Sequence, residues 1–241
     1  MPQFFDMHCH MLSGVDDGAG SSEEMFAMLE MAYEDGIRAV CLTPHYSPYL
    51  FGDTSERSEK SFARLEQYVA QRHPDMRVFL GHELGYYHGC LESLHSGKCR
   101  TVAGSRYVLI DFPAGISFFE LQGALDQLRF SGFFPILAHA ERYPCLFHRV
   151  KWIEEFVSSG GLVQVNASSA IGAWGKGSER LWKKLIKKRL VHVISTDAHN
   201  TSTRPPVMSV CLPFLNRYCT PAEIRRLTWE NACRIVCDKP I

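Results

Sequence analysis

The sequence lacks an excess of charge of either sign. Its 241 residues include 26 Lys and Arg and 26 Asp and Glu, so the formal net charge is zero with histidine neutral. Proteins that hold nucleic acid or a membrane surface by bulk electrostatics usually carry a positive excess. We therefore expect no nucleic-acid partner, whereas a small local phosphate site is compatible with this balance.

Disulfide, targeting and membrane-spanning signals are also missing. The nine cysteines are odd in number, scattered, and form no Cys-x-x-Cys pair, which argues against a secreted disulfide framework. The N-terminal stretch MPQFFDMHCH lacks the basic start and long apolar run of a signal peptide. No stretch reaches the roughly 18 uncharged apolar residues of a spanning helix. We expect a reduced, cytoplasmic protein that does not insert into a membrane.

A glycine-rich loop after the first strand, a linker and an internal repeat are absent as well. Instead, seven short apolar runs alternate with helical patterns, at residues 4–8, 37–43, 77–83, 106–112, 133–139, 162–166 and 191–196. Helices are predicted over 21–36 and 178–190. This alternation predicts parallel strands in an α/β barrel, formed by one domain over residues 1–241. The polar, aromatic segment 44–58 is expected to be a loop over one mouth of the barrel.

Side chains that bind metals follow the ends of these runs. They are His8, His10, His45, Glu83, His139, Asp197 and His199. The C-terminal ends of parallel barrel strands converge on one mouth, so we expect these side chains to meet. His8 and His10 are two residues apart on an extended strand and point to the same side, whereas Cys9 points away into the barrel wall. Imidazoles and carboxylates without a required thiolate predict a site for two or more divalent cations.

Each motif taken alone has an ordinary structural explanation. His-x-His pairs are common, and Asp16-Asp17-Gly18 is also typical of a simple turn. The other histidines are assigned to structure or surface, namely His73, His82, His88, His95, His148 and His192. Repetition at equivalent strand ends, rather than any single motif, favours the metal site.

Six short motifs occur in the order found in a known superfamily. They are DMHCH (6–10), GVDDG (14–18), TPHY (43–46), GHEL (81–84), LAHAERY (137–143) and STDAHN (195–200). From about residue 4 to the ENACRIV stretch at 230–236, the chain resembles the polymerase-and-histidinol-phosphatase (PHP) superfamily. The likeness is closest to its manganese-dependent bacterial protein-tyrosine phosphatases of capsule and exopolysaccharide loci.

The resemblance implies a distorted (β/α)7 barrel with three Mn²⁺ ions, other divalent metals being alternatives. In this scheme His8, His10, Glu83 and Asp197 hold one ion, Glu83 bridges to a second ion held by His45 and His139, and Asp17 and His199 hold a third. Asp16 is then a structural neighbour of the site rather than a ligand.

The resemblance also implies a function. Arg142 and Arg204 match arginines that engage the phosphate, and His199 is a candidate proton donor. The expected reaction is hydrolysis of phosphotyrosine by a metal-bridged hydroxide. The expected substrate is the tyrosine-rich cytoplasmic tail of a membrane kinase that controls polysaccharide chain length. The alternative is histidinol phosphatase or another small-molecule phosphomonoesterase. The oligomeric state stays open.

Two stretches match the Cys-x5-Arg spacing of thiol-based tyrosine phosphatases. They are CLPFLNR (211–217) and CTPAEIR (219–225). A loop that cradles phosphate needs a close backbone approach, for which glycine is the usual device, and both stretches lack glycine. We interpret both as chance matches, the first within an apolar helix and the second at a helix start.

Overall fold

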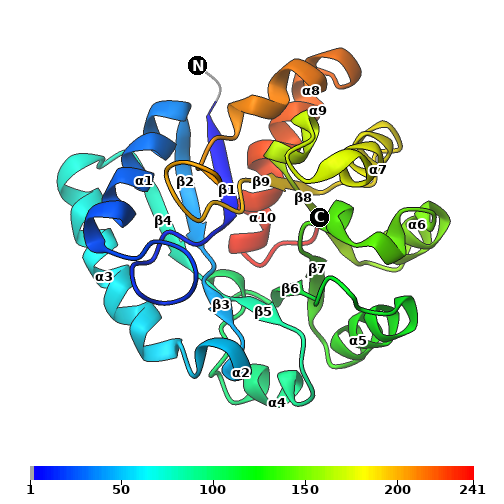
Figure 1. Ribbon diagram of the computed structural model, residues 1–241, viewed down its shortest axis with the longest axis horizontal. Coiled ribbons are helices and arrows are strands. Elements are labelled where there is room, and N and C mark those ends of the chain that lie inside the picture. Colours follow the sequence, from blue (N-terminus) through cyan, green and yellow to red (C-terminus); the bar gives the residue numbers. More distant parts are fainter. Residues whose placement is uncertain (1–2) are drawn as a thin grey trace.

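The computed structural model describes residues 3–241, in which nine parallel strands alternate with helices (Figure 1). The strands are β1 Phe4–Cys9, β2 Ile37–Leu42, β3 His45–Tyr46, β4 Arg77–Leu80, β5 Glu83–Gly85, β6 Tyr107–Asp111, β7 Phe134–Leu137, β8 Leu162–Asn166 and β9 Val193–Ser195. The α-helices are α1 Ser22–Asp35, α2 Pro48–Phe51, α3 Ser55–Arg72, α4 Cys90–His95, α5 Phe118–Phe130, α6 Val150–Ser158, α7 Gly175–Lys187, α8 Leu212–Tyr218, α9 Pro221–Arg225 and α10 Asn231–Val236. Short irregular turns of helix are η1 Val102–Gly104, η2 Ala140–Arg142, η3 Pro144–Leu146, η4 Ala167–Ile171, η5 Ser209–Cys211 and η6 Arg226–Glu230.

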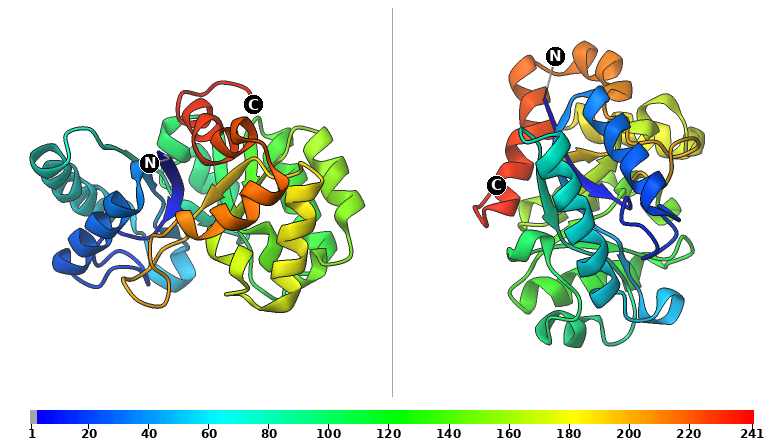
Figure 2. Two further views of the ribbon diagram at one scale, coloured as in Figure 1. Left: turned by 90° about the horizontal axis from the view of Figure 1, so that it is seen from above. Right: turned by 90° about the vertical axis from the view of Figure 1, so that its left-hand side faces the viewer.

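The strands form two parallel sheets, of three and six strands, which curl together with helices around their outside (Figure 2). Strands β1, β2 and β4 pair in that order, and β3, β5, β6, β7, β8 and β9 pair in a second row. The first strand meets the last through a parallel bridge between Cys9 and Ala198, where the Asp197 amide donates to the His8 carbonyl over 2.8 Å. Because β2 continues into β3 and β4 into β5, the nine strands fill seven strand positions. The expected (β/α)7 fold class is confirmed, and its distortion lies at these two bends.

Two of the expected elements differ from the structure. The run 77–83 is not one strand but two, β4 and β5, separated at Gly81. A Cβ atom at Gly81 would lie 3.1 Å from Val102 Cα and 3.2 Å from the Thr101 carbonyl oxygen. The close approach of η1 thus bends the chain here. The segment 44–58 is also not a plain loop, since it contains β3, α2 and the start of α3.

The helix predictions at 21–36 and 178–190 are confirmed as α1 and α7, apart from shifts of the ends. The Ser21 side chain caps α1 by accepting from the Glu24 amide, and Gly36 ends it in the left-handed region at a φ of 98°. None of the helices within residues 3–241 is both long and apolar enough to cross a membrane.

The apolar residues of the strands pack in two layers. One cluster lies between the strands and the outer helices and includes Val40, Val108 and Val163. The alternate strand residues form a second cluster inside the barrel, which includes Met7, Cys41, Leu109, Ile136 and Val193, together with Ala232 and Ile235 of α10. Helix α10 therefore closes one end of the barrel, and polar side chains fill the other end.

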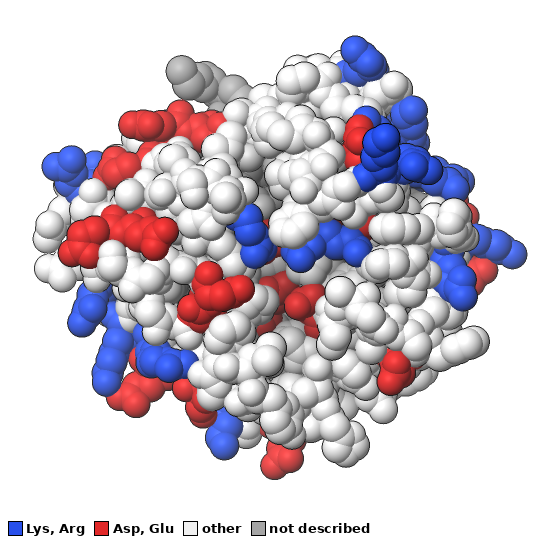
Figure 3. Space-filling view, in the orientation of Figure 1, with Lys and Arg blue, Asp and Glu red and all other residues white. Residues whose placement is uncertain are grey.

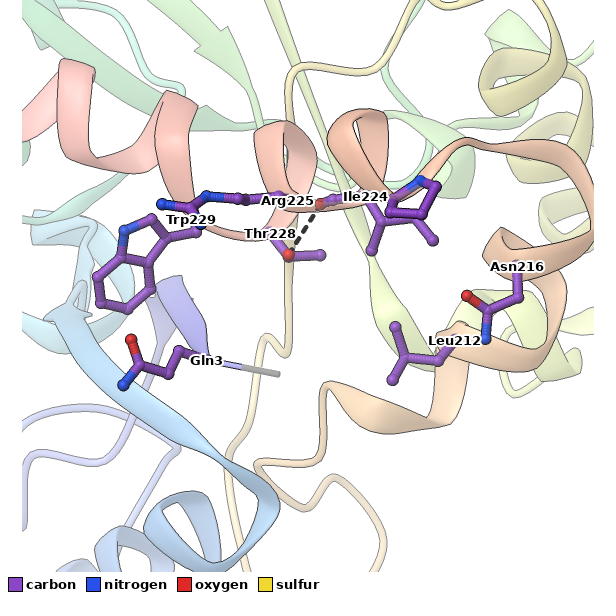
Figure 4. A pocket seen from close by; sticks show the side chains of 8 residues that line it. Gln3, Leu212, Asn216, Ile224, Arg225, Thr228 and Trp229 are labelled. Atoms are coloured by element: carbon purple, nitrogen blue, oxygen red, sulfur yellow. Dashed lines mark hydrogen bonds between the residues drawn. The ribbon is translucent and has the colours of Figure 1, made fainter. Parts of the chain in front are cut away.

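A groove of about 610 Å³ lies on the side of the barrel where β1 begins (Figure 4). It is lined by Gln3, Leu212, Asn216, Pro221, Ile224, Arg225, Thr228 and Trp229. The Thr228 hydroxyl is bonded to the Ile224 carbonyl at 2.8 Å, as Figure 4 shows. The lining includes no cysteine, histidine or carboxylate. The chemistry predicted from the sequence therefore belongs to the opposite end of the strands.

Candidate metal centre

The first two histidines come from the end of β1. His8 and His10 are fully buried, and their Nε2 atoms lie 3.2 Å apart. Cys9 packs with the outer apolar layer, as expected for a residue of the barrel wall. Two imidazole nitrogens that face each other this closely cannot both donate a hydrogen bond. A cation that accepts both lone pairs fits this arrangement.

The buried Glu83 carboxylate lies at the centre of the cluster. Its Oε1 atom is 3.2 Å from His8 Nε2 and 3.1 Å from His139 Nε2. Its Oε2 atom is 3.2 Å from His10 Nε2 and 3.0 Å from His45 Nδ1. Within residues 3–241, Oε2 accepts no well-directed hydrogen bond from these nitrogens. A buried carboxylate with two imidazoles at each oxygen has the donor set of a bridge between two cations.

Asp197 follows β9 and contacts the arginines. Its Oδ1 is 2.7 Å from Arg204 Nη2, and its Oδ2 is 2.8 Å from Arg142 Nη1. Both guanidinium groups lie against the Trp174 ring, at 3.8 Å for Arg142 and 5.1 Å for Arg204. Asp197 and His139 have positive φ values of 54° and 30°, a conformation that costs non-glycine residues energy. Two of the five non-glycine residues with positive φ in the described part of the chain thus lie at the site.

Asp16 and Asp17 have different surroundings. Asp16 accepts from His10 Nδ1 at 2.7 Å and from the His45 amide at 2.8 Å, so it holds two histidines in place. Asp17 is half exposed and lies 3.5 Å from His199 Nε2 and 3.6 Å from His45 Nε2. Asp17 therefore lies at the open side of the cluster, and Asp16 lies behind two of its histidines.

Gly18 allows the chain to fold tightly over His10. A Cβ atom at Gly18 would lie 1.9 Å from the His10 carbonyl oxygen, a distance that real side chains never show. Glycine is therefore required at this position.

Four groups of potential ligand atoms lie close enough to share a cation. They are His10, Asp17, His45 and His199; His8, His10 and Asp197; His8, Glu83 and His139; and His45, Glu83 and Asp111. All eight predicted ligands are thus brought together at one mouth. The grouping differs from the expected allocation, because His45 and His10 join the group of Asp17 and His199, and His139 shares a group with His8.

Sequence reasoning missed three polar residues of the site. Asp111 ends β6, and its Oδ1 lies 3.5 Å from His139 Nε2 and accepts from the Tyr143 hydroxyl at 2.8 Å. Gln164 Oε1 lies 3.1 Å from His8 Nδ1, and Asn166 Nδ2 donates to Asp197 Oδ2 at 2.8 Å. Asp111 could have been found from the sequence, because it is the one acid of the apolar run 106–112, whereas the amides Gln164 and Asn166 carry no metal signal of their own.

The charges of the cluster depend on one another. Burial lowers the pKa of His8, but Glu83 and Asp197 outweigh it and raise the pKa to about 9. In the same way the pKa of His45 rises to about 10, chiefly because Glu83 overcomes burial. Burial opposes ionisation of Glu83, yet the neighbouring histidines hold its pKa well below the usual range. Protons on imidazoles thus balance the buried carboxylates, and bound divalent cations would replace those protons.

The histidines outside the cluster that are buried have structural partners, as expected. His82 Nδ1 accepts from the Arg100 amide at 2.9 Å, and His73 Nε2 lies 2.9 Å from Glu30 Oε1. The Cys-x5-Arg cysteines do not have the surroundings of a nucleophile. Cys211 is buried, and burial raises its pKa to about 12, while burial also raises the pKa of Cys219.

Known proteins are similar in sequence to most of this chain. "Tyrosine-protein phosphatase CpsB" of Streptococcus pneumoniae is 28% identical over 241 residues, which cover 98% of this chain and 99% of the relative. "Tyrosine-protein phosphatase YwqE" of Bacillus subtilis is 27% identical over 199 residues, which cover 83% of this chain and 78% of the relative.

Solved structures share the fold. A chain from the structures of YwqE and CpsB, described as unique metal-dependent tyrosine phosphatases, superposes with a TM-score of 0.87 at 25% identity and covers 98% of this chain and 96% of itself. The phosphotriesterase homology protein of Escherichia coli, with a TM-score of 0.58 at 13% identity and 96% coverage of both chains, shares the barrel architecture alone. The family model described as "Capsular polysaccharide synthesis, CpsB/CapC" matches residues 4–237. This chain belongs to the CpsB/CapC family.

Proposed function

We propose that this protein is a metal-dependent protein-tyrosine phosphatase that regulates capsule or exopolysaccharide synthesis. The observation that carries the proposal is the buried Glu83 carboxylate between four imidazoles, with Arg142 and Arg204 beside the same cluster. The names of the CpsB and YwqE relatives support the activity. We further propose that residues 1–241 act as one catalytic domain.

The proposed resident metal is Mn²⁺, three ions per chain. The proposed ligands are His8, His10, Asp17, His45, Glu83, His139, Asp197 and His199, to which we add Asp111. When bound, such cations act as Lewis acids and lower the pKa of water, which supplies a nucleophile at neutral pH. Gln164 and Asp16 bond the Nδ1 atoms of His8 and His10, so that each Nε2 faces the centre.

The proposed phosphate clamp consists of Arg142 and Arg204. A guanidinium group presents paired donors to phosphoryl oxygens. They would stabilise the charge that develops on those oxygens in the transition state. Both groups lie over the Trp174 ring.

His199 suits a ligand better than a proton donor. Burial and the nearby His10 lower its pKa to about 4, so the imidazole is neutral at pH 7. Neutral imidazole is the form that coordination requires. A phenolate leaving group, whose conjugate acid has a pKa of about 10, departs more easily than an alkoxide even when the acid is imperfect.

Aromatic side chains near the cluster favour an aryl phosphate over a small alkyl phosphate. The Phe51 ring stacks on His45 at 5.5 Å with an interplanar angle of 4°, and Tyr49 beside it is exposed. We propose a cytoplasmic phosphotyrosine protein as the substrate, namely the tyrosine-rich tail of a polysaccharide-regulating kinase. The second candidate function is that of a histidinol phosphatase or another small-molecule phosphomonoesterase.

The test compares p-nitrophenyl phosphate, a phosphotyrosyl peptide and an alkyl phosphate before and after chelation. We expect activity to vanish in chelator and to return best with Mn²⁺, with both aryl substrates hydrolysed faster than the alkyl one. Full activity of a metal-free preparation would overturn the metal-dependent mechanism. A preference for the alkyl phosphate would favour the second candidate.

A further inference from the structure

The zero net charge of the chain conceals an uneven surface. Acidic side chains lie over α1, which contains Glu23, Glu24, Glu30 and Glu34. Basic side chains gather over α7 on the other side of the same face, as Figure 3 shows. Between the two areas, acidic and basic groups meet at the centre of the face (Figure 3). The basic area is therefore local, although the whole chain is neutral.

Helix α7 carries a row of exposed cations. Lys176, Arg180, Lys184 and Lys187 are all exposed and are spaced by four, four and three residues. This spacing places them along one side of a helix, opposite the buried Leu181 and Leu185. We call these four residues the α7 basic row. From Lys176 to Lys187 it extends about 16 Å, the length of an extended peptide of about five residues.

Acidic neighbours do not neutralise the α7 basic row. Glu179 pairs with Lys183, and Glu154 pairs with Lys188 at 2.6 Å. Across the part of the chain that the structure describes, none of the four residues of the row forms an ion pair. Lys187 instead lies over the Tyr218 ring at 4.4 Å. The row thus presents unpaired positive charge to solvent.

The α7 basic row begins beside the proposed phosphate clamp. Helix α7 starts at Gly175, directly after Trp174, whose ring contacts Arg142 and Arg204. The helix also packs against η2, the segment that contains Arg142. A groove of about 390 Å³ runs along it, lined by Phe147, His148, Gly177, Arg180, Leu181 and Lys184. The positive charge of the row therefore begins two residues after Trp174, and the groove lies beside Arg180 and Lys184 in the middle of α7.

We propose that the α7 basic row docks an anionic stretch of polypeptide that flanks the phosphotyrosine. The anionic groups are carboxylates or further phosphates of the same substrate, because both pair with lysine and arginine. This proposal rests on the phosphatase activity proposed above and adds a preference among its substrates. Exposed charge pairs are individually weak, so several together act on substrate capture rather than on the chemical step.

The test uses four substrates at low salt: p-nitrophenyl phosphate and three phosphotyrosyl peptides of equal length. One peptide has glutamate on both sides of the phosphotyrosine, one has neutral residues, and one has a second phosphotyrosine among neutral residues. We expect the unaltered protein to favour the acidic or doubly phosphorylated peptide over the neutral peptide by roughly tenfold in kcat/KM. The two anionic peptides distinguish carboxylates from phosphates. Physiological salt should reduce the preference, since it screens exposed charges beyond about 8 Å.

The variant R180Q/K184Q/K187Q should lose this preference and keep its turnover of p-nitrophenyl phosphate, which is too small to reach the row. A matched control is R64Q/K98Q/K239Q, which removes three other exposed cations and the same total charge. The charge-retaining variant R180K/K184R/K187R should keep the preference. Equal loss in the control would assign the effect to net charge and overturn the proposal.

Three other results would contradict the docking proposal or the phosphatase activity on which it rests. Equal kcat/KM on acidic and neutral peptides in the unaltered protein would overturn the proposal while leaving the phosphatase activity intact. Binding to vesicles of anionic phospholipid that the triple variant abolishes, without any peptide preference, would assign the row to a lipid surface instead. Absence of p-nitrophenyl phosphate turnover in the unaltered protein would refute the activity itself, which is a separate failure.

Discussion

At the scale of single residues, the carboxylates of Glu83 and Asp16 have different roles in the cluster. Glu83 lies between four imidazoles, so its loss would affect more than one cation at once. Asp16 stands behind His10 and the His45 amide and touches the centre only through them. The size of the functional loss should therefore separate a ligand from a residue that orients ligands.

Glu83→Gln should abolish activity and lower the metal content per chain, because a neutral amide cannot balance the charge of two cations. The group of His10, Asp17, His45 and His199 does not include Glu83 and should keep its ion. Asp16→Asn should cost about 10–100-fold in activity or metal affinity, as losses of supporting partners do. Metal content per chain and turnover of an aryl phosphate measure both effects. Equal losses in the two variants would contradict the distinction between these carboxylates.

The arginines give a second prediction at this scale. Arg142→Ala and Arg204→Ala should each lower turnover on the order of 10²-fold, the usual cost of one electrostatic donor to a transition state. Lysine should not restore the rate fully, because it has no fork of donors. Bound metal is measured in the same samples. Lost turnover with normal metal supports the phosphate clamp, whereas lost metal would mean that the arginines act through Asp197, which both contact.

The sequence allowed the proposed ligands to be predicted, but not the residues that hydrogen-bond them. His8, His10 and Glu83 could be found because they lie at or just after the ends of apolar runs in the sequence, and the strands formed by such runs converge on one mouth. Gln164 and Asn166 occur in an equally apolar run, but uncharged amides carry no metal signal until the barrel places them beside His8 and Asp197. Their role is set by contacts between distant strands, which local sequence does not encode.

At the scale of elements, the sequence predicted seven strand positions and missed the bends. Short apolar runs that alternate with helical patterns are local features, and they located the strand positions. The break at Gly81 depends on the approach of η1, twenty residues later in the chain. The bend has a functional result, because β5 begins at Glu83 and pairs with β3 at His45. Two proposed ligands are aligned by a distortion that the sequence pattern did not reveal.

The contact between β8 and the start of β9 gives a prediction about pH. His192 Nδ1 accepts from the Val163 amide at 3.1 Å, which requires neutral imidazole. Burial and Arg226 lower the pKa of His192 to about 4. His192 has a pKa near 6.5 in the unfolded chain. Between about pH 4 and pH 6.5, the unfolded chain therefore binds a proton at this residue more readily than the folded chain does. This contribution to stability is complete above about pH 6.5 and is lost as the pH falls toward 4.

His192→Asn can still accept from Val163 and does not titrate. When the pH is lowered from 7 to 5, the free energy of unfolding should decrease in both proteins. The decrease should be about 1–2 kcal/mol larger in the unaltered protein than in the variant. Urea unfolding at both pH values measures this difference. The exposed His88→Asn is the control and should keep the pH dependence of the parent. An identical pH dependence in His192→Asn would exclude this histidine as a source of acid sensitivity.

At the scale of the whole molecule, the barrel divides into an apolar and a polar end. Apolar side chains inside the strands pack against Ala232 and Ile235 of α10 at one end. Carboxylates and imidazoles are buried together at the other, and such groups are costly to bury unless their charges are balanced. Folding of the polar end is therefore linked to whatever supplies positive charge there, either protons or divalent cations.

Mn²⁺ binding should accordingly stabilise the folded chain and release protons. The pKa values of about 9 for His8 and about 10 for His45 keep both imidazoles protonated at pH 7 in the metal-free protein. Coordination requires the neutral ring, so metal uptake must expel these protons, and metal affinity must fall as the pH falls. A free metal concentration of 100 times Kd should stabilise the protein by about 2.7 kcal/mol and raise its Tm.

Calorimetric titration in two buffers of different ionisation enthalpy counts the protons, and thermal unfolding with and without Mn²⁺ measures the stability. Both effects should be smaller in Glu83→Gln. Binding of Mn²⁺ without proton release would mean that the histidines are neutral before the metal arrives, and that the carboxylates are balanced by Arg142 and Arg204 instead.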